Sequence, residues 1–590
     1  MPKRNEIKDE YKWKIADMFS SDSKWEDELA AVNKEIEGLG SDKTVTLDNL
    51  YSLLQRRDSV LRRVDYLYVY AGLKANEDST NTVYQAMSDR AEGLITAFSS
   101  ASAFIEPGIL SLDEKELLSA VQKEPLALYR HCIEDIVRNR EHILSGDKEE
   151  LLALFYEVGS APSNIFYMID NADMTFPEIA DSKGNMHPLS HGTYISCLES
   201  SDRVLRKNAF DTYYDTYFKQ KNTLASVYSS SVKRDIAFAR ARNYSSSLES
   251  MLFVNNIPTD VYKRLIETVN KHLPLMQRYV RLRKKMLGVD ELHFYDLYTP
   301  IVKKADTKKS YDEAKKEVLK AVAVLGENYV NTLTAALETD GWVDIYENEG
   351  KRSGAYSWGA YGCHPFVSLN YNDTVDSMFT LAHEMGHAMH SHYTWSNQPF
   401  VYGDYTIFVA EVASTVNEAL LMEHLLKTTK DKDFKAYLLN YFMEQFRGTL
   451  FRQTMFAEFE LITHEMAERG EALTFESLNK IYLDLNKKYF GEDIVYDEKI
   501  AWEWARIPHF YTAFYVYQYA TGYSAAIALS QNILNNNGAK PYIDFLKGGS
   551  SKYSIDLLKG AGVDMTSPEP VEKALKVFEG LLEQMESIAE

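Results

Sequence analysis

The stretch "FTLAHEMGHAMHS", residues 379–391, contains the order His-Glu-x-x-His within a segment of helical periodicity. His383 and His387 are four residues apart, so a helix of 3.6 residues per turn places them on one face, within reach of a single ion. Glu384 then lies about 100° round the helix, beside that ion, where it can take a proton from a metal-bound water. Residues 372–374 offer a cap for this helix. The stretch therefore predicts a hydrolytic metal site on a helix.

Chance is a poor explanation for this motif. With 14 histidines in 590 residues, the order is expected by chance only about 0.02–0.03 times in a chain of this size. A second His-Glu pair, in "THEMAERG" (463–470), has Glu468 where the second histidine would stand. We interpret His464 as an ordinary helical histidine, so the metal hypothesis applies to 383–387 alone.

A hydrolytic zinc site needs a third protein ligand and an open position for water. His390 lies one turn beyond His387 along a straight helix, and no glycine follows to break that helix. Glu411 lies in an expected second helix (405–426) among apolar residues, where a carboxylate is costly unless a cation pairs with it. We therefore favour Glu411, with a solvated surface charge as the alternative. Glu418, two turns further on, can orient a ligand histidine.

The remaining sequence has a mainly helical pattern. In 259–287 apolar residues recur three or four apart, and we expect Pro274 to kink or split this helix. Two segments interrupt the pattern. The "DSKGN" turn in 171–194 predicts a β-hairpin, and Gly-rich turns in 341–373 separate short apolar runs that predict a small sheet. Its last strand, "FVSLNY" (366–371), directly precedes the histidine helix.

Soft boundaries near residues 115 and 200 suggest three regions. They are an N-terminal helical region (1–115), a second region that contains the hairpin (116–200) and a catalytic region (201–590). We find no repeat of fixed period that would indicate a solenoid.

The amino-acid composition limits the kinds of partner that this protein is expected to bind. The formal charge of −21 disfavours nucleic acid and anionic membrane surfaces. The three cysteines are far apart and odd in number, which argues against a disulfide framework or a cysteine zinc knuckle. The N-terminus lacks the apolar core of a secretory signal, and we find no apolar run of about 18 residues. We expect a cytoplasmic protein that is a monomer or small homo-oligomer and is not membrane-bound.

An aromatic segment near the C-terminus, 504–529, is open to two interpretations. It carries His509 followed by four tyrosines at successive steps of four residues: Tyr511, Tyr515, Tyr519 and Tyr523. A tyrosine stripe at helical spacing is usually part of a core. A His–Tyr face beside a metal can instead stabilise the oxyanion of a tetrahedral intermediate. Spacing leaves both interpretations open.

Several motifs together resemble one known family. "GKRSGAYS", "FVSLNYND", "TLAHEMGHAMHS", "FVAEVAST" and "ARIPHFYTAFYVYQYATGYSAA" are similar to oligoendopeptidase F, of the thimet-oligopeptidase class of zinc metallopeptidases. The resemblance covers almost the whole chain. It implies a mainly α, multi-lobed, clam-like body with a deep channel for short unstructured peptides, and a small β-sheet next to the HExxH helix.

The resemblance also implies roles for individual residues. His383, His387 and Glu411 match the ligands of one Zn²⁺ ion per chain, and Glu384 matches the general base. His509 and Tyr519 match catalytic residues, and four further residues are expected to bind substrate: Tyr515, Tyr523, Gly354 and Tyr356. "FVSLNY" is expected to be an edge strand whose free backbone groups pair with an extended peptide.

We therefore predict a zinc-dependent endopeptidase that hydrolyses internal bonds of short oligopeptides, with Glu384 as the general base on a zinc-bound water. The alternative is a carboxypeptidase of the same family, in which Arg352 or Arg506 binds the terminal carboxylate. A hypothesis from another class is a helical interaction protein with an inert metal site or none.

Overall fold

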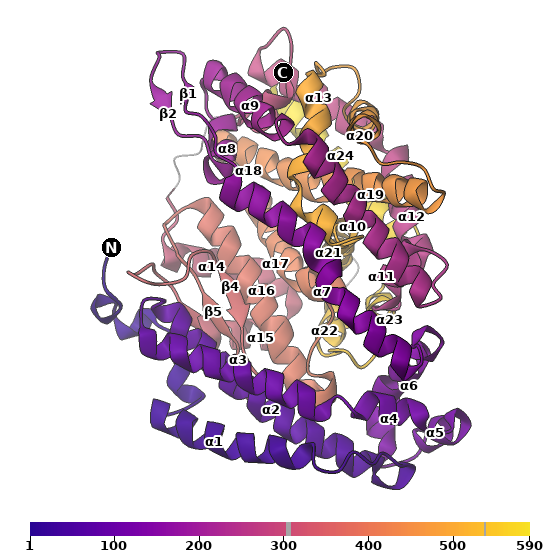
Figure 1. The fold of residues 1–590 in the computed structure, drawn as a ribbon. Helices are drawn as coiled ribbons and strands as arrows, with labels where there is room; N and C mark the ends of the chain where they lie inside the picture. Colours follow the sequence, from indigo (N-terminus) through magenta and orange to yellow (C-terminus); the bar gives the residue numbers. More distant parts are fainter. Residues whose placement is uncertain (303–307, 536–537, 590) are drawn as a thin grey trace. The chain divides into compact units, whose positions relative to one another are not determined.

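The computed structural model describes residues 1–302, 308–535 and 538–589. It divides into two compact units, each assembled from three separate segments of the chain (Figure 1). Unit 1 comprises Met1–Glu141, Thr307–Leu425 and Leu529–Val563, and unit 2 comprises His142–Asp306, Leu426–Ala528 and Asp564–Glu590. The three contiguous regions suggested by the sequence stay a prediction.

The elements of unit 1 are mostly helices. They are α1 Asp22–Leu39, α2 Leu47–Glu77, α3 Thr82–Ser102, α4 Ile105–Ser111, α5 Glu114–Ala120, α6 Arg130–Arg138, α14 Tyr311–Ala321, α15 Glu327–Glu338, β3 Val343–Asp344, β4 Tyr356–Trp358, β5 Phe366–Ser368, α16 Val375–Asn397, α17 Ile407–Thr428, α22 Ala539–Leu546 and α23 Ser554–Gly560. The last turn of α17 continues into unit 2.

Unit 2 is built in the same way. Its elements are α7 Gly146–Met168, β1 Ile179–Ala180, β2 Met186–His187, α8 His191–Leu198, α9 Arg203–Phe218, α10 Lys221–Ala241, α11 Ser247–Phe253, α12 Thr259–Lys271, α13 Leu273–Leu287, α18 Lys432–Gln445, α19 Arg452–Glu468, α20 Phe475–Phe490, η11 Glu498–Arg506, η12 Pro508–Tyr511, α21 Tyr517–Asn535 and α24 Glu569–Ala589. The C-terminal part of α21 continues into unit 1.

The mainly helical class predicted from the sequence is confirmed. The helix expected over 259–287 is split, because Pro274 lies in the first turn of α13, where its missing N–H is not needed. The hairpin expected in 171–194 is present as the antiparallel pair β1–β2, with Ile179 opposite His187.

The small sheet beside the histidine helix has the order β3-β5-β4, and β4 and β5 pack against α16 (Figure 1). β5 runs parallel to β3 and antiparallel to β4, so it is the central strand. The prediction that "FVSLNY" is an edge strand is therefore wrong. The amide of Val367 donates to the Trp342 carbonyl on the β3 side at 2.8 Å, and β4 occupies the other side.

The N-terminal helices are held by an apolar core. The inward faces of α1, α2 and α3 meet there, with Trp25, Leu67 and Leu94 nearly inaccessible to solvent. One helical stretch, Thr82–Ser111, is apolar and long enough to cross a membrane, although a core helix of a soluble protein meets the same criterion. The expected lack of membrane association stays a prediction.

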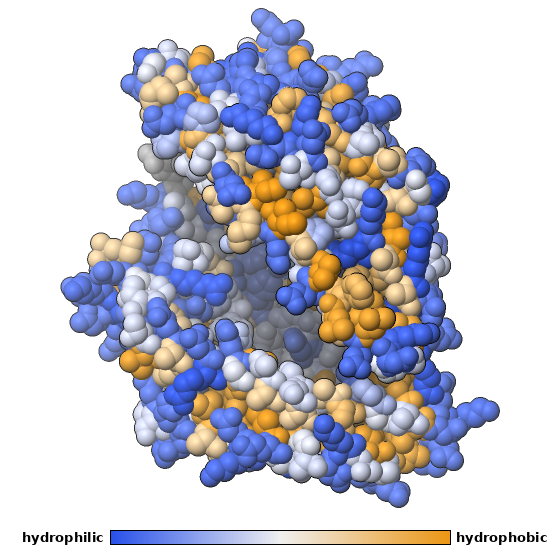
Figure 2. Space-filling model, viewed as in Figure 1, coloured by the Kyte–Doolittle hydropathy of each residue, from blue (hydrophilic) through white to orange (hydrophobic). Residues whose placement is uncertain are grey.

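Helix α7 keeps many apolar side chains on the surface. Leu154 is 71% exposed and Val158 is 66% exposed, and Phe155, Tyr156 and Tyr167 are more than half exposed. In Figure 2 apolar atoms gather along the line that this helix follows in Figure 1. Beside it, α7 and α10 line an open apolar groove of about 670 Å³.

Helices α16 and α17 approach each other closely at Gly386. A Cβ atom on this residue would lie 2.6 Å from Ser414 Cα and 2.7 Å from the Ala413 carbonyl oxygen. The side-chain amide of Asn417 donates to the Ala382 carbonyl at 3.2 Å and ties the helices together. This backbone contact brings the first turns of α17 against the middle of α16.

We predict that Gly386→Ala lowers the free energy of unfolding by about 1–3 kcal/mol, because the added methyl group overpacks the contact between α16 and α17. Gly93→Ala in α3 is the matched control. Apart from the adjacent residues and the nearby backbone of α3 itself, no atom of the described residues lies within 4 Å of the Cβ position there, so this variant should change the free energy of unfolding by less than about 1 kcal/mol, toward stability. Equal thermal unfolding midpoints for the two variants would contradict the packing argument.

Candidate metal centre

Helix α16 presents the His-Glu-x-x-His motif from its middle. Its N-cap is Thr374, whose Oγ1 accepts a hydrogen bond from the Ser377 amide at 3.1 Å, which agrees with the cap predicted at 372–374. The helix runs without interruption to Asn397. His383 and His387 therefore share one face, as the spacing predicts.

Three side-chain atoms converge at this face. His383 Nε2 and His387 Nε2 are 3.2 Å apart, and Glu411 Oε2 lies 3.3 Å from the first and 3.4 Å from the second. In a tetrahedral zinc site with metal–ligand bonds of about 2.0–2.2 Å, ligand atoms are about 3.3–3.6 Å apart. The triangle therefore matches three corners of such a tetrahedron. Within the described part of the chain, these three side chains form a group that could hold a metal ion.

Glu418 fixes the orientation of one histidine. His383 Nδ1–H donates to Glu418 Oε1, which leaves Nε2 directed at the group. Burial opposes the charged form of His383, but its hydrogen bonds to Glu411 and Glu418 prevail and raise its pKa to about 10. The same contacts with His383 and His387 hold the pKa of Glu411 well below its usual value. Both shifts mean that the group stabilises a positive charge where its three atoms converge.

Glu384 is 7% exposed. Burial raises its pKa, and the positive charge on His383 and His387 opposes this change. A carboxyl group whose pKa moves toward neutrality is suited to accept and return a proton during a reaction.

The other histidines considered in the sequence lie elsewhere. His390 is 1% exposed and stacks on Tyr405 with ring centroids 3.8 Å apart, and burial lowers its pKa to about 3. Glu411, and not His390, joins the two motif histidines. His464 of the second His-Glu pair is buried in unit 2, where Nδ1 donates to the Glu460 carbonyl at 2.8 Å.

The aromatic segment does not form one helix. Helix α21 begins at Tyr517, so Tyr511 and Tyr515 precede it. Three rings still form a cluster in unit 2: His509 is 6.2 Å from Tyr515 and 5.9 Å from Tyr519, and the two tyrosines are 5.5 Å apart. This cluster belongs to a different compact unit from the metal group.

Tyr523 does not belong to this cluster. It is 6% exposed and packs edge-on against Phe446 at 5.0 Å. It lies in the core of unit 2, as a tyrosine at helical spacing usually does.

Gly354 and Tyr356 lie in the Gly-rich loop before and within β4. Gly354 adopts φ +81°, and its carbonyl accepts from Asn370 Nδ2 at 2.8 Å. The Tyr356 ring packs against Trp13 at 6.3 Å, and its hydroxyl accepts from Asn76 Nδ2 at 2.7 Å. The Tyr356 side chain is thus engaged inside unit 1, while its backbone belongs to an edge strand.

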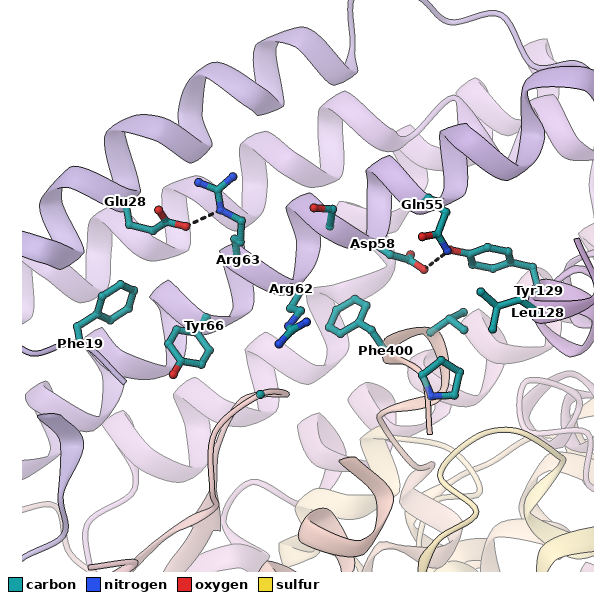
Figure 3. A pocket seen from close by; sticks show the side chains of 14 residues that line it. Phe19, Glu28, Gln55, Asp58, Arg62, Arg63, Tyr66, Leu128, Tyr129 and Phe400 are labelled. Atoms are coloured by element: carbon teal, nitrogen blue, oxygen red, sulfur yellow. Dashed lines mark hydrogen bonds and ion pairs between the residues drawn. The ribbon is translucent and has the colours of Figure 1, made fainter. Parts of the chain in front are cut away.

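Unit 1 also contains a cavity that sequence reasoning did not identify (Figure 3). It measures about 750 Å³ and includes Phe19, Arg62 and Phe400 in its lining, but not the three residues of the metal group. Several of its polar groups pair with one another: Arg63 bonds Glu28, and the Tyr129 hydroxyl donates to Asp58 at 2.8 Å (Figure 3). These contacts link the helices that surround the cavity.

Comparisons with known proteins agree with this geometry. Residues 196–577 match the family model "Peptidase family M3", and residues 109–176 match the model "Oligopeptidase F". The chain is 51% identical to "Oligopeptidase PepF" of Bacillus subtilis over 100% of this chain and 88% of the relative. It is 43% identical to "Group B oligopeptidase PepB" of Streptococcus agalactiae over 99% and 98% of the two chains.

Solved structures are similar over nearly their whole length. Oligoendopeptidase-F from Enterococcus faecium aligns with a TM-score of 0.73 at 39% identity, covering 96% of this chain and 99% of that one. A solved peptidase chain from Chlamydophila abortus aligns with a TM-score of 0.92 at 36% identity, covering 99% of each chain.

The raised pKa of His383 predicts how zinc binding depends on pH. Because this pKa is about 10, the metal must displace a proton at neutral pH. The apparent zinc affinity should therefore rise about tenfold for each pH unit between about pH 6 and pH 9. Chelator-competition titrations at several pH values measure this slope. A zinc affinity that does not change with pH would contradict the raised pKa of His383.

Proposed function

The chain belongs to peptidase family M3, and on that premise we propose that it is a zinc-dependent endopeptidase that hydrolyses internal bonds of short oligopeptides. The observation that carries this proposal is the triangle formed by His383 Nε2, His387 Nε2 and Glu411 Oε2. Its donor set of two imidazoles and one carboxylate is that of catalytic zinc sites with one open position.

Zinc bound at this group would supply a Lewis acid that polarises the scissile carbonyl and makes water acidic enough to be a nucleophile near neutral pH. Glu384 takes the proton from the attacking water and later delivers it to the departing amine nitrogen. Glu418 holds His383 with Nε2 toward the group. Burial of Glu384 excludes bulk water from this proton transfer.

The peptide backbone is proposed to add to β4. The amide of Val367 is bonded on the β3 side, so in the alternating antiparallel ladder its neighbours Phe366 and Ser368 bond β4. Their partners in β4 are Trp358 and Tyr356. The N–H and C=O groups of Ser357, between them, therefore point to the open edge, where an extended peptide can pair with them. This places strand addition on β4 instead of β5.

The cluster of His509, Tyr515 and Tyr519 is proposed to contact the substrate. His509 and Tyr519 would stabilise the oxyanion, and Tyr515 would bind the peptide. These roles rest on the family resemblance, and the grouping of the three rings within unit 2 supports them. The burial of Tyr523 argues against its direct contact with substrate.

The carboxypeptidase alternative depends on a free cation. Arg506 is engaged by Glu503 at 2.7 Å, whereas Arg352 is exposed and lies 5.4 Å from the centre of the Tyr356 ring. Arg352 is thus the better candidate for binding a terminal carboxylate. Membership of a peptidase family rules out the interaction-protein hypothesis. Cytoplasmic location and a monomeric or small oligomeric state stay predictions.

We predict that Glu384→Gln lowers kcat for peptide hydrolysis by about 10²–10⁴-fold, because the amide cannot accept the proton. Its zinc content, measured by elemental analysis, should equal that of the parent enzyme. Glu465→Gln is the matched control, since Glu465 belongs to the second His-Glu pair and is exposed. A Glu384→Gln variant that cleaves at the parental rate would show that Glu384 is not the general base.

A peptide blocked at both ends distinguishes the two modes of cleavage. An endopeptidase should cut it at internal bonds, because no free terminus is needed. Mass spectrometry of the products after brief incubation identifies the bonds that are cut. If the blocked peptide stays intact while its free-carboxylate form is shortened from the C-terminus, the carboxypeptidase alternative is correct.

A further inference from the structure

Helix α19 of unit 2 carries a buried carboxyl group that the proposed mechanism does not use. Glu460 is 0% exposed, and its Oε1 accepts a hydrogen bond from the backbone amide of Phe514 at 2.9 Å. Its backbone carbonyl accepts from His464. Burying a carboxyl group away from solvent costs free energy. The presence of Glu460 at this position therefore needs an explanation.

The amide belongs to a strained residue. Phe514 is 2% exposed and has φ +55°, a backbone conformation that a bulky side chain rarely adopts. Strained residues persist only where the surrounding structure holds them, and they concentrate at functional sites. Phe514 lies five residues after His509 and directly before Tyr515, so its conformation sets the direction of the chain between two rings of the aromatic cluster.

The segment His509–Phe514, the cluster turn, is fixed at several points within unit 2. The Thr512 amide donates to the His509 carbonyl at 2.9 Å. The Arg234 guanidinium donates to the Tyr511 carbonyl at 3.3 Å while it pairs with Asp235. Glu460 fixes the far end through Phe514. Helix α10 therefore holds the middle of the turn, and α19 holds its far end.

Aromatic packing also holds the side chain of Phe514. The Phe514 ring lies 4.5 Å from the His464 ring and 5.5 Å from the Tyr262 ring, measured between centroids. His464 is itself fixed, with Nε2 3.4 Å from Asp235. The second His-Glu pair of the sequence thus contributes its histidine to the support of the cluster turn.

We propose that Glu460 is a positioning residue for peptide hydrolysis: by accepting the Phe514 amide it holds the cluster turn, and so keeps His509, Tyr515 and Tyr519 in their mutual arrangement. The inference deepens the proposed function and rests on the roles given there to His509 and Tyr519. It assigns Glu460 no contact with substrate or metal.

The chemistry of Glu460 agrees with this role. Burial raises the pKa of Glu460 well above its usual value, helped by the nearby charge of Asp235 and opposed by the hydrogen bond from the Phe514 amide. In either protonation state Glu460 has a side-chain oxygen that can accept the amide, as Oε1 does here. Glutamine offers the same acceptor in the same shape, whereas methionine fills the space without an oxygen.

The experiment compares Glu460→Gln, Glu460→Met and His509→Ala in zinc-loaded enzyme with a short quenched-fluorescence peptide. We expect Glu460→Gln to keep kcat within about twofold of the parental value. Glu460→Met should lower kcat about 10-fold to 100-fold, because small displacements of groups around a reacting centre have effects of this size. KM and zinc content should stay at parental values in both Glu460 variants.

The double variant Glu460→Met/His509→Ala tests the connection between the two residues. If Glu460 acts through the cluster turn, the double variant should lose less activity than the product of the two single losses, because both changes disturb the role of His509. Parental kcat in Glu460→Met, or losses in the double variant equal to the product of the single losses, would overturn the inference alone. Parental kcat in His509→Ala would instead overturn the proposed role of His509, and with it this inference.

If Glu460→Met does not fold, Phe514→Gly gives a second test. Glycine adopts φ +55° without strain but loses the ring packed on His464 and Tyr262 and lets the turn move. We expect kcat to fall at least about fivefold at parental zinc content. A Phe514→Gly variant with parental kcat would show that holding this turn does not matter for catalysis.

Discussion

The backbone contact between α16 and α17 is the constraint on which the proposed site depends. Gly386 has no Cβ, so Ser414 and Ala413 of α17 can lie against it. This places Glu411, one turn before Ser414, beside two histidines of α16. The same approach lets Glu418, further along α17, reach the other side of the His383 ring. One close helix pair thus supplies two nitrogens, a carboxylate oxygen and the group that orients the first nitrogen.

The charges of the surrounding side chains favour a cation at this site. Glu411 and Glu418 bring negative charge to a half-buried site, and burial alone would disfavour every charged form there. The carboxylates raise the pKa of His383, and the two histidines hold the pKa of Glu411 down, so a positive charge is stabilised where the three atoms converge. Zinc held by His383, His387 and Glu411 would supply the positive charge that these three groups favour. Glu384 stays beside the group, and its burial raises its pKa above the usual value.

Local rules predicted much of this centre. The i, i+4 spacing brings His383 and His387 together because both lie on one uninterrupted helix, and the structure places Glu411, the carboxylate that the sequence favoured, beside them. Features set by distant parts of the chain were not predictable. The order of the sheet depends on which segment pairs with each side of Val367, so "FVSLNY" proved central. The tyrosine spacing suggested one helix, but Phe514, with its positive φ, lies between Tyr511 and Tyr515, and α21 begins only at Tyr517. The role of Gly386 depends on Ser414, and that of Glu460 on Phe514, which sequence alone does not connect.

The location of the metal in zinc-loaded crystals tests the central claim most directly. Anomalous diffraction at the zinc edge should show one ion per chain, bonded at about 2.0–2.2 Å to His383 Nε2, His387 Nε2 and Glu411 Oε2. The Nδ1 atom of His383 should face Glu418. An ion that is bonded by His390 instead of Glu411, or one that lies away from α16, would contradict the account.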